Sequence, residues 1–258
     1  MVIPVYNRLS SLKDAIESVL FQTFKDFEII IIDDCSDYVI SERLFHYLPM
    51  VTVLRNEHNM GVSYSRNRGI KIAKGTYVAL LDSDDVWLPF KLEYQINEIE
   101  KAGSLICHSD EFWYRDGIFV NKSKKHKKCV AKSFGDIIDI CRISPSSVLM
   151  HRNIFNKAGY FDVNLRVCED YDFWLRVGTY FDFLYLPVPT IVKRAISQDQ
   201  LSKSIQNIEY MRLKILNSYL KKCSVIPFFY KYAVIKEIDR KTAIVKRGIN
   251  KSLKTLDS

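Results

Sequence analysis

Long apolar runs, signal sequences and paired cysteines are all missing from this chain of 258 residues. No stretch of about 18 uninterrupted apolar residues occurs, so we expect no membrane-spanning helix. The start, MVIPVYNR, has neither the basic nor the apolar region of a signal peptide. The six cysteines form no C-x-x-C pair, so we expect no zinc site, no disulfide framework and a cytoplasmic location. They are Cys35, Cys107, Cys129, Cys141, Cys168 and Cys223.

Glycine is also scarce, with nine residues in the whole chain. Neither G-x-G-x-x-G nor G-x-x-x-x-G-K-[ST] occurs, and these are the loops whose backbone amides cradle phosphates. A bound phosphate would therefore need another source of positive charge. The apolar fraction of 48% and charged fraction of 26% are those of a globular protein, which excludes whole-chain disorder, collagen and coiled coil.

The net charge of +8 is unevenly distributed. Residues 203–258 hold 13 Lys and Arg against 4 Asp and Glu, whereas residues 1–202 hold 25 against 26. We therefore expect a nearly neutral domain over 1–202, in halves 1–100 and 101–202, and a basic helical extension over 203–258. A basic extension could bind nucleic acid, bind an anionic membrane surface or simply keep the protein in solution. The chain has no nucleic-acid recognition motif, so we do not expect nucleic-acid binding.

In the first half of the chain, apolar patterns typical of strands alternate with apolar patterns typical of helices. β-Branched runs predict strands over 1–5, 27–32, 51–54 and 76–81. Helical spacing predicts helices over 38–48 and 62–73. It also predicts a helix that begins at Ser11, where Asp14 is the capping partner of Ser11. This alternation indicates an α/β fold with a parallel sheet. The second half predicts strands over 104–120, 147–150, 183–186 and 190–193, and helices over 89–101, 133–142, 152–158, 171–180, 203–222 and 228–247.

Each of the first four predicted strands ends in polar residues. They are Tyr6-Asn7, Asp33-Asp34, Arg55-Asn56 and Asp82-Ser83-Asp84-Asp85. Ligands of open α/β sheets bind at the carboxyl ends of the strands, so we expect these groups to share one crevice.

Two acidic clusters are candidates for chemistry. Asp82, Asp84 and Asp85 are hard oxygen ligands for Mg²⁺ or Mn²⁺, and a cation bridging them to a diphosphate would relieve their repulsion. The alternative is a solvated acidic turn. The second cluster is Glu169-Asp170-Tyr171-Asp172. In it, Asp170 or Asp172 suits a general base, but acidic residues at a helix start also complement the helix dipole. Spacing leaves both interpretations open.

The ordered set of motifs resembles glycosyltransferase family 2. The matching segments, which cover about residues 1–202, are IPVYNR (3–8), IIIDDCSD (30–37), NMGVSYSRNRGI (59–70), GTYVALLDSDDVW (75–87), SPSSVLMHRNIFNKAGYFD (144–162) and CEDYDFWLR (168–176). The resemblance implies the type A glycosyltransferase fold, a Rossmann-like, mostly parallel sheet flanked by helices, here with a C-terminal helical extension.

The resemblance also implies an activity. It is inverting, single-displacement transfer of a hexosyl or related sugar from a nucleotide-diphosphate donor, usually UDP-linked, with Mn²⁺ or Mg²⁺. The acceptor would be a hydroxyl of a glycan or lipid-linked saccharide in polysaccharide or other glycan biosynthesis. By motif, the nucleoside pocket would contain Pro4, Val5 and Tyr6, Asp33 would accept from the base, and Arg66 would lie near the nucleotide. Asp84 would be the main metal ligand, Asp82 would face ribose or metal, Asp85 would share the metal, and Asp170 would be the base, with Asp172 in reserve.

Two other functions stay open. A sugar-phosphate nucleotidyltransferase would need a glycine-rich basic loop after the first strand, which NRLSSLKD lacks. A non-catalytic nucleotide-binding or membrane-associated scaffold would not need the full carboxylate set. Residues 228–235 (FFYKYAVI) suit an interfacial helix at the inner face of an anionic membrane, or a helix that packs on the domain.

Overall fold

The first three strands form a parallel sheet. The computed structural model describes residues 1–115, 117–121, 128, 132–195, 208–222 and 226–256. Strands β1 (Val2–Val5), β2 (Ile30–Asp33) and β3 (Thr52–Arg55) lie in the order β1-β2-β3, with Val2 opposite Ile30. β1 and β2 are buried along their whole length, as expected for parallel strands covered on both faces.

The remaining strands form a mixed sheet in the order β4-β8-β6-β9-β5, with β7 paired to β6. Their bounds are β4 Tyr77–Ala79, β5 Val86–Trp87, β6 Ile106–Arg115, β7 Ile118–Val120, β8 Val148–His151 and β9 Leu184–Ala195. A parallel bridge between Val2 and Leu80 places the end of β4 beside β1, while β4 pairs antiparallel with β8. The expected α/β fold is confirmed, with parallel pairing in one sheet and mixed pairing in the other.

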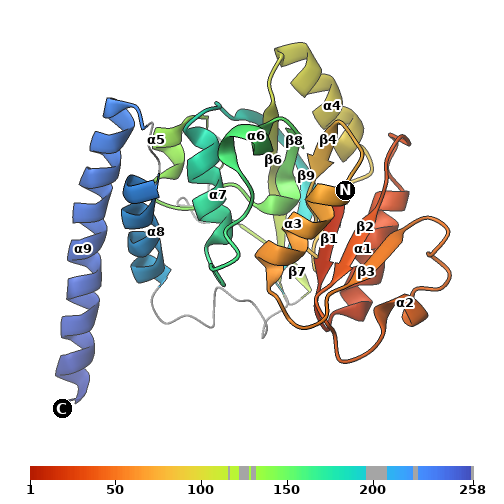
Figure 1. The fold of residues 1–258 in the computed structure, drawn as a ribbon, viewed down its shortest axis with the longest axis horizontal. Coiled ribbons are helices and arrows are strands. Elements are labelled where there is room, and N and C mark those ends of the chain that lie inside the picture. The colour runs from red at the N-terminus through yellow and green to blue at the C-terminus, as the bar shows by residue number, and fades with distance from the viewer. Residues whose placement is uncertain (116, 122–127, 129–131, 196–207, 223–225, 257–258) are drawn as a thin grey trace.

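Helices cover both faces of the parallel sheet (Figure 1). α1 (Leu9–Leu20) and α2 (Ile40–Arg43) share one apolar core with Ile3 and Ile31, while α3 (Val62–Ile72) and α7 (Glu169–Gly178) share the other with Val2 and Ile30. The predicted cap of α1 is wrong, because the helix begins at Leu9 and the hydroxyl of Ser11, inside its first turn, donates to the Arg8 carbonyl. The other helices of the domain are α4 (Lys91–Ala102), α5 (Phe134–Ile137) and α6 (Ile154–Ala158), with a 3₁₀ turn at Pro145–Ser147.

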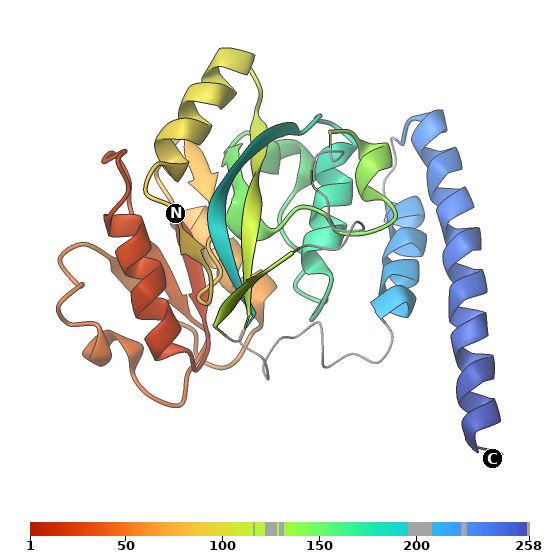
Figure 2. The same cartoon turned by 180° about the vertical axis from the view of Figure 1, so that it is seen from behind.

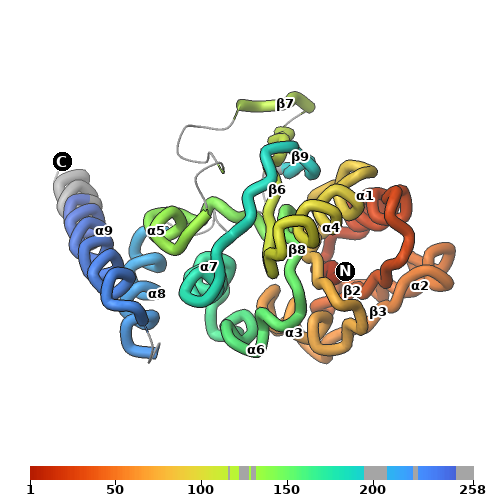
Figure 3. Tube along the Cα trace, turned by 90° about the horizontal axis from the view of Figure 1, so that it is seen from above, coloured from red at the N-terminus to blue at the C-terminus, as the bar shows by residue number. Residues whose placement is uncertain are grey.

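Two C-terminal helices, α8 (Ile208–Lys222) and α9 (Phe228–Leu256), lie side by side at the end of the molecule away from the parallel sheet (Figures 2 and 3). Leu216 and Tyr219 of α8 are buried in the core that also holds α7. The ring of Phe134 in α5 stacks on Tyr219 and on Tyr230 of α9. Both helices therefore pack on the domain. The predicted boundary near residue 202 falls outside the described residues.

No helix in the described part of the chain is long and apolar enough to cross a lipid bilayer.

Candidate functional site

Buried carboxylates tie the loop after β2 to the end of β3 and the loop that follows it. Asp33 is 1% exposed and accepts hydrogen bonds from Arg55 Nη1 at 2.7 Å and from the Ser36 amide at 2.9 Å. Asp34 accepts from Asn56 Nδ2 at 2.7 Å and from the amides of Met60 and Gly61. The sequence had not singled out Asp34 for a role, yet it fixes the segment that leads into α3.

The residues expected to line a nucleoside pocket lie beside Asp33. Val5 is directly opposite Asp33 in the sheet, and Pro4 is opposite Ile32. Pro4 and Val5 are buried, whereas Tyr6 projects from the end of the strand and is 43% exposed. Tyr6 therefore follows the residue that pairs with Asp33, and contact of either residue with a base stays a prediction.

Arg66 of α3 joins the two acidic clusters. Its Nη2 lies 2.6 Å from Asp82 Oδ1 and its Nη1 lies 2.7 Å from Glu169 Oε1, although Glu169 is 103 positions away in the chain. Arg66 is 3% exposed, and its guanidinium lies 5.3 Å from the centre of the Phe161 ring. A Cβ on Gly69, one turn further on, would lie 2.3 Å from a methyl carbon of Val2, so only glycine lets α3 pack this closely on β1.

Arg66 favours ionisation of both partners, but the pKa values of the two carboxyls shift in opposite directions. Burial disfavours ionisation of Asp82, but the charges of Arg66 and Lys193 outweigh it and lower the pKa of that carboxyl. For Glu169, burial and the charge of Asp170 outweigh Arg66 and raise the pKa. The bridge thus holds an ionised Asp82 close to a second, more basic carboxyl.

Further cations face the cluster after β4. Arg8 Nη1 lies 2.6 Å from Asp84 Oδ2, while burial and the charge of Asp82 raise the pKa of Asp84. Lys193 of β9 is held in its charged form, because the carboxylates of Asp85 and Glu111 raise its pKa despite burial. The sequence offered a signal for Lys193, since a lysine is unusual in an apolar predicted strand.

Asp85 is more enclosed than Asp84. It is 1% exposed and accepts from Ser146 Oγ at 2.7 Å and from the Arg194 amide at 3.1 Å. Burial raises its pKa to about 7. Both oxygens therefore already have donors from other segments of the chain.

Asp170 lies in the first turn of α7, next to Glu169. Its Oδ2 lies 3.3 Å from the Sγ of Cys141, which donates to it, and its Oδ1 accepts from the Tyr171 amide at 2.7 Å. Through Glu169 and Arg66 the candidate base is therefore connected to Asp82. The structure thus brings Asp82 to Glu169, the neighbour of Asp170, and the role of Asp170 as base stays a prediction.

Asp172 has different surroundings. Its Oδ2 accepts from Arg176 Nε at 3.0 Å and Nη2 at 2.8 Å. It lines a cavity of about 270 Å³ together with Tyr160 and Lys222. No contact in the described part of the chain connects it to Asp82, so the structure does not bring this reserve base into the Arg66 cluster.

The donor set at Asp82 and Asp84 suits a divalent cation that also binds substrate phosphates. Mg²⁺ is usually held by one or two carboxylates plus phosphate oxygens rather than by a full protein cage. Within the described residues, no three His, Cys, Asp or Glu side chains are placed to hold a metal by themselves. Two carboxylates therefore fit the chemistry of a shared ion.

Comparison with known proteins identifies the protein family. Residues 1–159 match the family described as Glycosyl transferase family 2, and the chain belongs to this family. An uncharacterized glycosyltransferase of Rickettsia felis is 36% identical over 187 residues, which are 69% of this chain and 30% of that protein. The Escherichia coli UDP-Glc:alpha-D-GlcNAc-diphosphoundecaprenol beta-1,3-glucosyltransferase WfaP is 28% identical over 180 residues, covering 69% of this chain and 68% of that protein. The chain thus spans less than a third of the Rickettsia relative.

Solved structures share the fold. Staphylococcus aureus TarS in complex with UDP-GlcNAc has a TM-score of 0.76 at 18% identity, covering 94% of this chain and 72% of that chain. The mannosyltransferase PcManGT of Pyrobaculum calidifontis, in complex with GDP-Man and Mn²⁺, has a TM-score of 0.68 at 10% identity, covering 98% and 79%.

Proposed function

We propose that this protein transfers a sugar, with inversion, from a UDP-linked donor to a hydroxyl of a lipid-linked saccharide in polysaccharide biosynthesis. The observation that carries the proposal is the Arg66 bridge, which connects the acidic turn after β4 to the first turn of α7. The name of the Escherichia coli relative, with its UDP-linked donor and diphosphoundecaprenol-linked acceptor, supports this choice of substrates. Membership of a glycosyl transferase family favours this activity over nucleotidyl transfer.

The reaction is a single displacement. The acceptor oxygen forms a bond to the anomeric carbon, the bond from that carbon to the diphosphate breaks, and its electron pair leaves with the diphosphate. Asp170 takes the hydroxyl proton at its carboxylate. Asp82 and Asp84 would hold Mn²⁺ or Mg²⁺, with Asp85 as a reserve ligand, and a bound ion would offset charge on the leaving diphosphate. Arg8 adds a positive charge on the same side.

Replacement of the base is the direct test. We expect Asp170→Asn to lower turnover about 10²–10⁴-fold, the usual contribution of a general base, while UDP binding persists. Asp172→Asn is the matched control on the same helix, because its carboxylate pairs with Arg176 instead. Wild-type turnover in Asp170→Asn would refute the assignment. A larger loss in Asp172→Asn would make Asp172 the base, and a wild-type protein that binds UDP but transfers no sugar from a panel of UDP-sugars would favour a scaffold.

We also propose that α9 touches an anionic membrane surface at the cytoplasmic face. The exposed apolar side chains at its start recur at helical spacing: Phe228 (87% exposed), Phe229 (75%), Tyr232 (61%) and Ile235 (44%). Lys231 and Lys236 are exposed beside them. Apolar and basic residues on one helix bind anionic interfaces, with about 1 kcal/mol from each basic residue near the surface.

A further inference from the structure

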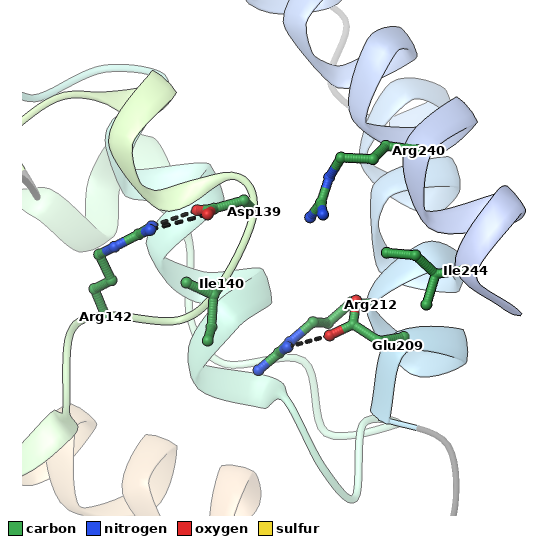
Figure 4. A pocket seen from close by; sticks show the side chains of 7 residues that line it. All are labelled: Asp139, Ile140, Arg142, Glu209, Arg212, Arg240 and Ile244. Atoms are coloured by element: carbon green, nitrogen blue, oxygen red, sulfur yellow. Dashed lines mark hydrogen bonds and ion pairs between the residues drawn. The ribbon is translucent and has the colours of Figure 1, made fainter. Parts of the chain in front are cut away.

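A cavity of about 330 Å³ lies between the loop after α5 and the two C-terminal helices (Figure 4). Three arginines from three separate segments line it: Arg142 from the loop, Arg212 from α8 and Arg240 from α9. Convergence of three guanidinium groups on one cavity is unusual, because like charges repel unless anions lie among them.

The carboxylates of the protein only partly satisfy these arginines. Arg142 pairs with Asp139, Arg212 Nη1 lies 2.6 Å from Glu209, and Arg240 uses its Nε and Nη2 for Glu237. Arg212 is 9% exposed, and within the described residues its Nε is buried without a hydrogen-bond partner. A buried N–H group without an acceptor costs free energy, so native structures usually supply one from protein, water or ligand.

The residues that line the cavity carry a net positive charge. Arg142, Arg212 and Arg240 outnumber the acidic Asp139 and Glu209 by one. Lys241, which is fully buried, donates to the carbonyl of Asp139 at 2.8 Å and to Glu209 at 2.6 Å, so Arg212 and Lys241 share the Glu209 carboxylate. An anion that enters this space therefore meets an excess of positive charge.

The loop that lines the cavity also contacts the candidate base. Cys141, whose thiol donates to Asp170, is the neighbour of Arg142 in the chain. Arg142 lines the cavity, whereas Asp170 is not among the lining residues. The cavity and the candidate base are thus connected through Arg142 and Cys141.

We propose that this arginine-lined cavity binds the phosphate or diphosphate group of the acceptor. The inference rests on the proposed function and assigns the anchoring of the acceptor to the C-terminal extension. Guanidinium groups match phosphate oxygens in charge and in hydrogen-bond geometry, which makes arginine the usual residue for such recognition. The volume is within the lower range of small-molecule sites.

The test is titration of the full chain with pyrophosphate in saturating UDP, which keeps the probe out of the donor site. We expect Arg212→Gln and Arg240→Gln each to raise the pyrophosphate Kd about tenfold or more, the usual effect of losing a charged hydrogen bond. Arg247→Gln is the matched control, because Arg247 is exposed on α9 and, among the described residues, donates only to the Ala243 carbonyl of its own helix. Arg240 is half exposed, so its replacement keeps the test valid even if Arg212→Gln fails to fold.

An unchanged Kd in Arg240→Gln, or an equal rise in Arg247→Gln, would overturn the proposal. Geranyl diphosphate below its micelle concentration distinguishes the two sources of phosphate: tighter binding than pyrophosphate indicates a lipid-linked acceptor, and weaker binding indicates a soluble phosphate. Binding of UDP to the wild type distinguishes failure of the cavity proposal from failure of the proposed function. If UDP binds but the pyrophosphate Kd is unchanged by the arginine substitutions, the cavity proposal fails and the proposed function stands. If UDP does not bind and pyrophosphate still depends on Arg240, the proposed donor is wrong and the anion site stands.

Discussion

Replacing Arg66 by methionine should destabilise the protein strongly, because it leaves two enclosed carboxylates without their shared cation. The side chain of Arg66 is 4% exposed, that of Glu169 is 11% and that of Asp82 is 23%. Removal of one partner from a buried ion pair costs about 3–5 kcal/mol, and partial exposure of Asp82 favours the lower end. We therefore expect Arg66→Met to lose about 3 kcal/mol, which for a chain of this size lowers Tm by about 6–12 °C. Methionine keeps an apolar stem against the Phe161 ring.

The loss should depend on pH. With Arg66 present, the pKa of folded Asp82 lies below its unfolded value, so its contribution is present above about pH 4 and disappears as the pH falls through the lowered folded pKa. In the variant, protonation relieves the unpaired carboxyls. The difference in unfolding free energy between wild type and Arg66→Met should therefore be largest near pH 7 and shrink towards pH 4.

Urea denaturation at several pH values measures this difference. Arg68→Met is the control on the same helix, because in the described part of the chain Arg68 donates only to neutral oxygens, the Arg55 carbonyl at 2.7 Å and Asn56 Oδ1 at 2.8 Å. It should lose about 1 kcal/mol with no pH dependence. If Arg66→Met loses no more than this control, or loses the same amount at pH 4 and pH 7, Arg66 does not hold the two clusters together.

Three further predictions concern the metal, a buried lysine and the membrane. Asp84→Ala should abolish stimulation of sugar transfer by Mn²⁺ along with activity, and full wild-type activity in a chelator would refute the metal role. Lys91 is fully buried, and burial lowers its pKa from 10.5 to about 7. Between pH 7 and pH 10.5 the unfolded chain therefore binds a proton at Lys91 that the folded chain has released. Wild-type unfolding free energy should thus rise by at least about 1 kcal/mol from pH 7 to pH 9.5, and a curve for Lys91→Met with the same slope would contradict this. The double variant Phe228→Ser/Phe229→Ser should pellet less with anionic vesicles. Phe21→Ser should pellet like wild type, because Phe21, which is 73% exposed, directly follows α1 at the other end of the chain; equal pelleting of both variants and the wild type would end the membrane proposal.

Local pattern predicted much of the parallel sheet and its helices. The run of isoleucines ending at Asp33 is a buried strand because alternate side chains meet apolar cores on opposite faces. The helix predicted over 62–73 is observed at Val62–Ile72. The two strands predicted over 183–186 and 190–193 are instead one strand, β9, which follows β6 through an irregular register near Asp110. Such continuity depends on pairing with β6 and leaves no signal in β9 itself.

The sequence by itself determined which side chains stand at the ends of the strands, because strand ends follow from local apolar runs and the polar residues that stop them. It therefore supplied Asp33, Asp82 and Asp84 as candidates, and the acidic start of a predicted helix supplied Asp170. Only the tertiary structure decided which charge faces which. Arg66 meets Glu169 across 103 positions, and Arg142, Arg212 and Arg240 meet around one cavity, because these contacts are set by how helices and loops pack, and packing distance is not encoded in sequence spacing.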